Sequence, residues 1–251
     1  MSKLRKVDGL FYDLDLPDIN KSLKYRAMKV KETKILLTAI EMHDENATVN
    51  AILDIVEAAT KASFNVRELP MYLIDLIFLK IYIKSSGTQS MGVFKCGGTV
   101  HVPATEEAEA HDEPCGTQVN VAIDLESAGL IKDPDFKEKT VIDVGDGQSI
   151  VLRAPSLEKF KKIKFEVDEQ ARYVYASIES IVDGDDIRIP GQDFELEELN
   201  EWMDELDGQV LARITDFFKK IPQLGLDVKV TCPKCGRKEE FELKGLEDFF
   251  V

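Results

Sequence analysis

The four cysteines are the residues of this sequence whose types and spacing could do chemistry. Cys232 and Cys235 form a Cys-Pro-Lys-Cys-Gly turn near the end of the chain, while Cys96 and Cys115 lie far upstream with a long segment between them. Each pair is entered by a strand-like segment that ends on a cysteine, and each second cysteine is followed by glycine. Because Zn²⁺ takes four ligands in a tetrahedron and thiolates suit it, the two pairs together predict one zinc site.

The predicted zinc is structural, since four cysteine ligands leave no open position for a catalytic water. His101 and His111 lie in the segment between the upstream cysteines, and replacement of a ligand by either of them stays open. A thioredoxin-like redox pair would need a strand-to-helix junction, whereas Cys232 and Cys235 lie between two predicted strands. Four unrelated buried cysteines are the remaining alternative. The predicted ligands are Cys96, Cys115, Cys232 and Cys235.

No catalytic motif accompanies the cysteines. The sequence contains neither a phosphate-binding Gly-x-x-x-x-Gly-Lys-Ser/Thr loop nor a Gly-x-Ser-x-Gly nucleophile turn. The acidic clusters YDLDLPD and DGDD lack the spacing of a calcium-binding loop. We therefore expect a protein that is not an enzyme.

Charge and hydropathy narrow the class of partner. The 251 residues carry 32 Lys+Arg against 47 Asp+Glu, which gives a formal net charge of −15. Such a surface repels the phosphates of nucleic acids and anionic lipid headgroups, so neither is an expected partner. The longest apolar stretch is interrupted by Asp75 and Lys80 and is too short to span a bilayer. Without a recognisable signal peptide, the expected location is cytosolic, where disulfides are rare.

Hydrophobic periodicity predicts a hairpin followed by three helices in the N-terminal region. Residues 10–30 form two strand-like segments around a turn. Apolar residues recur at helical spacing over 31–43 and again over 47–62. Residues 71–86 are apolar nearly all the way round, which predicts a central buried helix.

The remaining chain mixes strands and helices, and residues 105–113 are expected to be loose. Strands are expected at 92–96 and 117–125, hairpins at 139–155 and 226–243, and helices at 155–166, 168–184, 193–206, 208–221 and, as a single turn, 245–250. This pattern predicts an α+β fold that is mostly helical, with short β-hairpins and a discontinuous zinc-ribbon-like module. The predicted domains are the hairpin and helices of 1–90, the zinc module of 91–126 with 226–251, and the hairpin and helices of 127–225.

The order of several elements in the first half of the chain resembles the T4-type phage baseplate hub protein family. The resemblance rests on a strand entering a helix at Val30–Ala39, an apolar helix at Leu69–Gly87, the knuckle cysteines Cys96 and Cys115, and the strand Val121–Leu125. It implies a structural component or assembly factor of a contractile tail baseplate hub. The implied partners are other phage tail and baseplate hub proteins. The implied location is the host cytoplasm during assembly or the baseplate of the virion, and a homo-oligomer stays open.

A second hypothesis is a zinc-ribbon regulator that binds the transcription machinery or nucleic acid. The net charge of −15 and the lack of a stripe of aromatic and basic residues disfavour it.

Two apolar segments leave a choice between internal packing and docking to a partner. They are the helical pair of residues 200–221 and the terminal aromatics Phe249 and Phe250.

Overall fold

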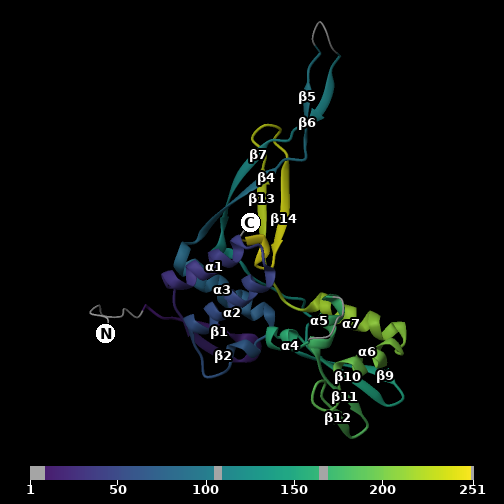
Figure 1. Cartoon of the computed structure of the whole chain (residues 1–251). Helices are drawn as coiled ribbons and strands as arrows, with labels where there is room; N and C mark the ends of the chain where they lie inside the picture. The colour runs from purple at the N-terminus through teal and green to yellow at the C-terminus, as the bar shows by residue number, and fades with distance from the viewer. Residues whose placement is uncertain (1–8, 105–108, 164–168, 250–251) are drawn as a thin grey trace, which may run out of the picture.

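The computed structural model describes residues 9–104, 109–163 and 169–249, which form three hydrophobic clusters (Figure 1). The largest cluster lies under the N-terminal helices and also takes in Leu224 and Phe249 from the end of the chain. A second cluster lies among the strands and helices of residues 136–221. The third is small and contains Cys96, Cys115 and Cys232. The predicted domain division stays a prediction.

The N-terminal body is built around one helix that is buried on nearly every side. Ile77, Leu79 and Ile81 of this helix are fully buried, so the prediction of a central helix is confirmed. The antiparallel sheet β1-β2-β3 and two further helices pack against it. The elements are β1 (Tyr12–Leu16), β2 (Lys21–Tyr25), α1 (Val30–Glu41), α2 (Glu45–Ala59), β3 (Thr60–Lys61) and α3 (Met71–Ser86).

Two antiparallel hairpins extend away from this body, and a third, short hairpin extends beyond them (Figure 1). In the figure the teal hairpin β4–β7 and the yellow hairpin β13–β14 run in the same direction, with β5–β6 farthest from the helices. β13 also pairs with β8 at its start, which ties it to the N-terminal body. The strands are β4 (Gln89–Lys95), β5 (Thr99–Val102), β6 (His111–Pro114), β7 (Gln118–Asp124), β8 (Gly129–Ile131), β13 (Gln223–Thr231) and β14 (Lys238–Lys244).

The second body combines a four-stranded antiparallel sheet, ordered β12-β11-β10-β9, with four helices. Leu199, Ile214 and Phe217 of the helices belong to the same buried cluster as the strand residues Ile150 and Leu152. The elements are β9 (Lys139–Gly145), β10 (Gln148–Arg153), α4 (Leu157–Lys162), α5 (Glu169–Ser177), β11 (Ile178–Asp183), β12 (Asp186–Arg188), α6 (Leu196–Asp204) and α7 (Gly208–Lys220).

The fold is α+β, but the prediction that it is mostly helical is wrong. Strands make up nearly as much of the described chain as helices, and they form five small sheets. The helix expected over 168–184 ends at Ser177, and Ile178–Asp183 continues as β11. Isoleucine and valine are stiff at χ1 and favour a strand, and Ile181 lies opposite Ile150 of β10. The periodicity of a segment does not indicate the distant strand with which that segment pairs.

The predicted zinc-ribbon-like module also needs correction. The four cysteines cluster where two hairpins meet, but this arrangement is not established as a zinc ribbon. The segment expected to be loose contributes residues His111–Glu113 to β6, which pairs with β5. An alternating Thr-Val-His-Val sequence at 99–102 is the signal that indicates this extra hairpin.

The two apolar segments left open by the sequence pack internally to a large extent. Val210, Ile214 and Phe217 of α7 are buried in the second cluster, while Leu211 remains 58% exposed. Phe249 is buried in the largest cluster, and Phe250 lies outside the described residues. Among the described helices, none combines the length and the apolar character that crossing a membrane requires.

Candidate metal centre

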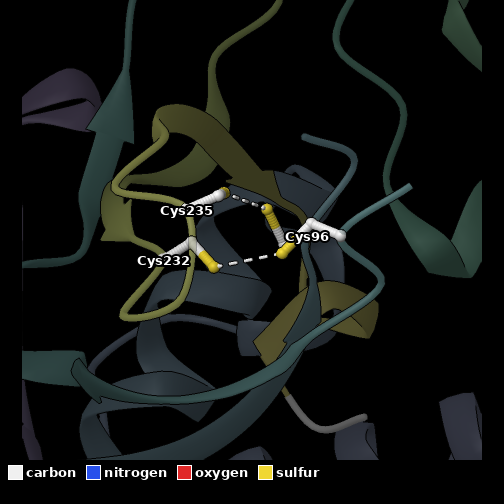
Figure 2. A group of neighbouring side chains, drawn as sticks. Cys96, Cys232 and Cys235 are labelled. Carbon is white, nitrogen blue, oxygen red and sulfur yellow. Dashed lines mark hydrogen bonds between the residues drawn. The ribbon is translucent and has the colours of Figure 1, made fainter. Parts of the chain in front are cut away.

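Two turns from distant parts of the chain bring the four cysteines together. Cys96 follows β4 and Cys115 precedes β7, while Cys232 and Cys235 lie in the turn between β13 and β14. Figure 2 shows the labelled Cys96, Cys232 and Cys235 pointing toward a common centre from the two facing turns. Backbone bonds close each turn: the Cys96 amide donates to the Thr117 carbonyl at 2.9 Å, and the Cys232 amide donates to a carbonyl five residues later at 2.8 Å.

The spacing of the four sulfurs fits a tetrahedral metal ion. Cys96 Sγ lies 3.5 Å from Cys235 Sγ, and Cys115 Sγ lies 3.7 Å from Cys232 Sγ. All four sulfurs lie within 4.8 Å of one another. A Zn–S distance of about 2.3 Å in a tetrahedron gives a sulfur–sulfur edge of roughly 3.8 Å. A disulfide would require a distance of about 2.05 Å, so these contacts are not disulfides.

Glycines allow the chain to wrap tightly around the sulfurs. Gly116 and Gly236, each directly after a cysteine, adopt φ values of 58° and 72°, a left-handed region that favours glycine. Gly98 faces the sulfurs, and its amide donates to Cys96 Sγ at 3.3 Å. A Cβ atom at Gly98 would lie only 3.0 Å from the sulfur of Cys235.

The site is nearly closed to solvent. Cys96, Cys115 and Cys232 are 3%, 7% and 1% exposed, and the side chain of Cys235 is half-buried. Stacked rings of Phe94 and Phe241, with centroids 5.8 Å apart, lie between the hairpins. Such a closed set of four sulfurs suits a metal that stabilises structure rather than one that binds a substrate.

The electrostatics of the cluster favour a cation. The backbone amide of Cys235 lowers the pKa of the Cys232 thiol to about 6. The amide of Gly98 favours the Cys96 thiolate, but burial and the neighbouring sulfurs outweigh it and raise the pKa of Cys96 to about 12. Like charges in one site disfavour each other, so the four sulfurs cannot all be thiolates without a cation between them. A divalent ion would remove that conflict and deprotonate the remaining thiols.

Both histidines lie outside the sulfur cluster. His101 and His111 are exposed on the β5–β6 hairpin. His101 Nδ1 lies 2.9 Å from a carboxylate oxygen of Asp112, and His111 Nδ1 lies 3.1 Å from the Glu109 carbonyl oxygen. Within the described part of the chain, the group whose ligand atoms converge contains the cysteines and neither histidine.

Two residues that contact the cysteine cluster were not predicted from the sequence. The Thr117 hydroxyl lies 3.2 Å from Cys115 Sγ and lowers the pKa of that thiol. Gly98 fills a position where a side chain would collide with the sulfurs. The signal for Gly98 is the pair of consecutive glycines that follows Cys96, one more glycine than the turn at the second pair contains.

Comparison with known proteins gives a match over almost the whole chain. The model of a family described as "T4 bacteriophage base plate protein" matches residues 11–251. The chain is also similar to the baseplate hub assembly protein gp26 of Enterobacteria phage T4, with 25% identity over 240 residues. That alignment covers 95% of this chain and 97% of the relative. No solved structure matches.

Proposed function

The chain belongs to the family of T4 bacteriophage base plate proteins, and from this premise we propose that it helps to build the hub of a phage baseplate. The observation that carries the proposal is the nearly end-to-end similarity to a baseplate hub assembly protein. The resemblance of the first half of the chain is thus confirmed, and the family match extends it through the second half. The proposed activity is binding of other tail and baseplate proteins rather than catalysis.

The proposed cofactor is one structural Zn²⁺ ion held by the four cysteines. The sulfur separations of 3.5 and 3.7 Å support it, as do the closed site and the absence of a disulfide between the free cysteines. Bound zinc would supply a cross-link between the β4–β7 and β13–β14 hairpins, which are far apart in sequence. This cross-link would hold the C-terminal hairpin against the middle of the chain.

Replacement of Gly98 by alanine is expected to weaken zinc binding by about tenfold or more. The new Cβ atom would lie 3.0 Å from Cys235 Sγ and 3.3 Å from Cys96 Sγ, so the sulfurs would have to move. Gly97→Ala is the matched control, because a Cβ atom there meets nothing within 4 Å. Competition with a chromophoric zinc chelator measures both affinities. Equal affinity in the two variants would contradict the proposed coordination.

The assembly role is tested in the phage that encodes the chain. When the chain is not produced, infected cells are expected to lack complete baseplates, and its return from a plasmid should restore them. Sedimentation of lysates followed by electron microscopy measures the intermediates. Normal baseplates without the chain would refute the proposed role.

The place where the chain acts is tested by mass spectrometry of purified virions and of infected-cell lysate. We propose that it binds its partners in the host cytoplasm during assembly. Presence in virions would identify a baseplate subunit, and its restriction to the lysate would identify an assembly factor. Recovery with RNA polymerase or nucleic acid, and not with tail proteins, would favour the zinc-dependent regulator instead.

A further inference from the structure

Strand β4 leaves one of its edges unpaired. Among the described strands it pairs with β7 alone. The bonds from the Cys96 amide to the Thr117 carbonyl and from the Leu125 amide to the Thr88 carbonyl fix the phase of this antiparallel ladder. Hydrogen-bonded pairs alternate along such a ladder, so Met91 and Val93 direct their N–H and C=O groups away from β7. These groups are available to another strand.

The sequence of β4 does not protect this edge. Protein chains commonly shield edge strands with charged residues or proline. The edge strands β1, β9 and β14 carry such charges, but Ser90–Phe94 has none. Met91 and Val93 are instead 61% and 68% exposed. The one charge of β4 is Lys95 at its end, so most of this edge is uncharged and carries exposed apolar side chains, the kind of surface that accepts a further strand.

An apolar cavity lies next to this edge. The β4–β7 hairpin packs face to face on β14, where Phe94 stacks on Phe241. A cavity of about 330 Å³ lies between the hairpins, and Gly92 is among the residues that line it. Its apolar lining includes Ile123, Phe241 and Phe249. A strand added beside β4 would point alternate side chains into this space, because successive side chains of a strand face opposite ways.

The charges around the cavity specify the kind of strand. Its two charged lining residues, Glu239 and Asp248, are both acidic, and Glu239 also forms an ion pair with Arg237. The net charge of −15 adds to the negative potential and opposes the approach of a second, equally acidic copy. A segment with apolar residues at alternate positions and a lysine or arginine complements both the cavity and its rim.

We propose that β4 is a docking edge for an extended segment of a partner baseplate protein, which adds as a strand beside Met91 and Val93. The segment inserts apolar side chains at Gly92 and places a basic side chain near Glu239 and Asp248. This inference rests on the proposed function for the identity of the partner.

Proline substitution tests the docking edge. Val93→Pro removes an outward N–H group without removing a bond of the β4–β7 ladder. Asn120→Pro is the matched control, because Asn120 lies opposite Val93 and directs its N–H to the free edge of β7. The probes are fluorescent twelve-residue peptides that tile the baseplate proteins of the encoding phage. Anisotropy measures their affinity for both full-length variants and the unmodified chain.

We expect one or more basic, alternately apolar peptides to bind the unmodified chain and Asn120→Pro with similar affinity. Val93→Pro should bind them about tenfold or more weakly, since a lost bond leaves a peptide carbonyl unpaired. Val93→Lys, with Asn120→Lys as its control, should show the same contrast if Val93→Pro does not fold, as judged by circular dichroism.

Three results would overturn the inference: no peptide binds, the paired variants bind equally, or light scattering shows a dimer that Val93→Pro abolishes. The last result would assign the edge to a second copy of the chain. Failure here is distinguishable from failure of the proposed function. A phage that lacks the chain would still fail to build baseplates, whereas a phage carrying Val93→Pro would build them normally.

Discussion

Replacement of Cys232 by serine is expected to remove the bound zinc, from about one ion per chain to nearly none. Cys232 is the most buried ligand, at 1% exposed, and its sulfur lies 3.7 Å from that of Cys115. A serine hydroxyl is a much poorer zinc ligand than a thiolate, so three sulfurs would remain at a site built for four. Elemental analysis of protein purified without chelator measures the loss.

The same substitution is expected to loosen the turns that hold the cysteines and the short β5–β6 hairpin beyond them, while the main bodies stay folded. Zinc binding to such sites contributes on the order of 10 kcal/mol in small zinc peptides, and the cluster around the cysteines contains few other buried residues. Hydrogen exchange should therefore increase in β5, β6 and the turn that carries Cys235. It should remain slow in α3, many of whose side chains are buried in the largest cluster.

His101→Ala is the control for this prediction. Its imidazole contacts Asp112 and lies outside the group of converging sulfurs, so zinc content and hydrogen exchange near the cysteines should not change. Unchanged zinc content in Cys232→Ser, or a loss of zinc in His101→Ala, would contradict the ligand set.

The cysteine pairs are the part of the site that the sequence predicts best. A Cys-x-x-Cys turn between two strands indicates a metal site by local pattern alone. The two upstream cysteines then raise the number of possible ligands to four. Gly98 and Thr117 could not be assigned in this way. Their contacts with the sulfurs depend on how the β5–β6 insertion leaves the turn, which is a matter of three-dimensional packing.

The fold was predictable for elements with strong hydrophobic periodicity. It was not predictable where pairing with a distant strand determines the secondary structure. Residues 71–86 are so apolar that they can only be buried, and they form α3. By contrast, Ile178–Asp183 continues the helical spacing of the preceding residues but pairs with β10. Strand β13 pairs with β8 across a long sequence separation, and no local pattern indicates that contact.

A buried ion pair in the N-terminal body was also not predicted from the sequence. Arg26 follows β2 and Glu32 lies in the first turn of α1, and they are 6% and 4% exposed. Arg26 donates two parallel bonds to the Glu32 carboxylate, at 2.8 and 2.9 Å. It also donates to the Ala58 carbonyl at 2.8 Å, while the Lys29 amide donates to Glu32 at 2.7 Å. The pair therefore joins β2 to both α1 and α2.

Replacement of Glu32 by alanine is expected to lower the free energy of unfolding by about 3–5 kcal/mol, because it leaves the Arg26 guanidinium buried without its counter-charge. Urea denaturation followed by circular dichroism measures the loss. The double variant Arg26→Met/Glu32→Leu should recover much of it, since an apolar pair of similar volume removes the buried charge. Glu240→Ala breaks the exposed pair with Lys229 and should change stability little.

The pH dependence of stability supplies a second test of the same pair. Burial alone would raise the pKa of Glu32, but the bonds from Arg26 and the Lys29 amide outweigh it, and the pKa is lowered. The native state therefore favours the carboxylate, and its stabilising contribution is fully present above the unfolded pKa of about 4.3. It is lost as the pH falls through the lower native pKa. The unmodified chain should lose this part of its stability in that acidic range, whereas the double variant should not. Parallel pH profiles for the two proteins would show that the buried ion pair does not stabilise this body.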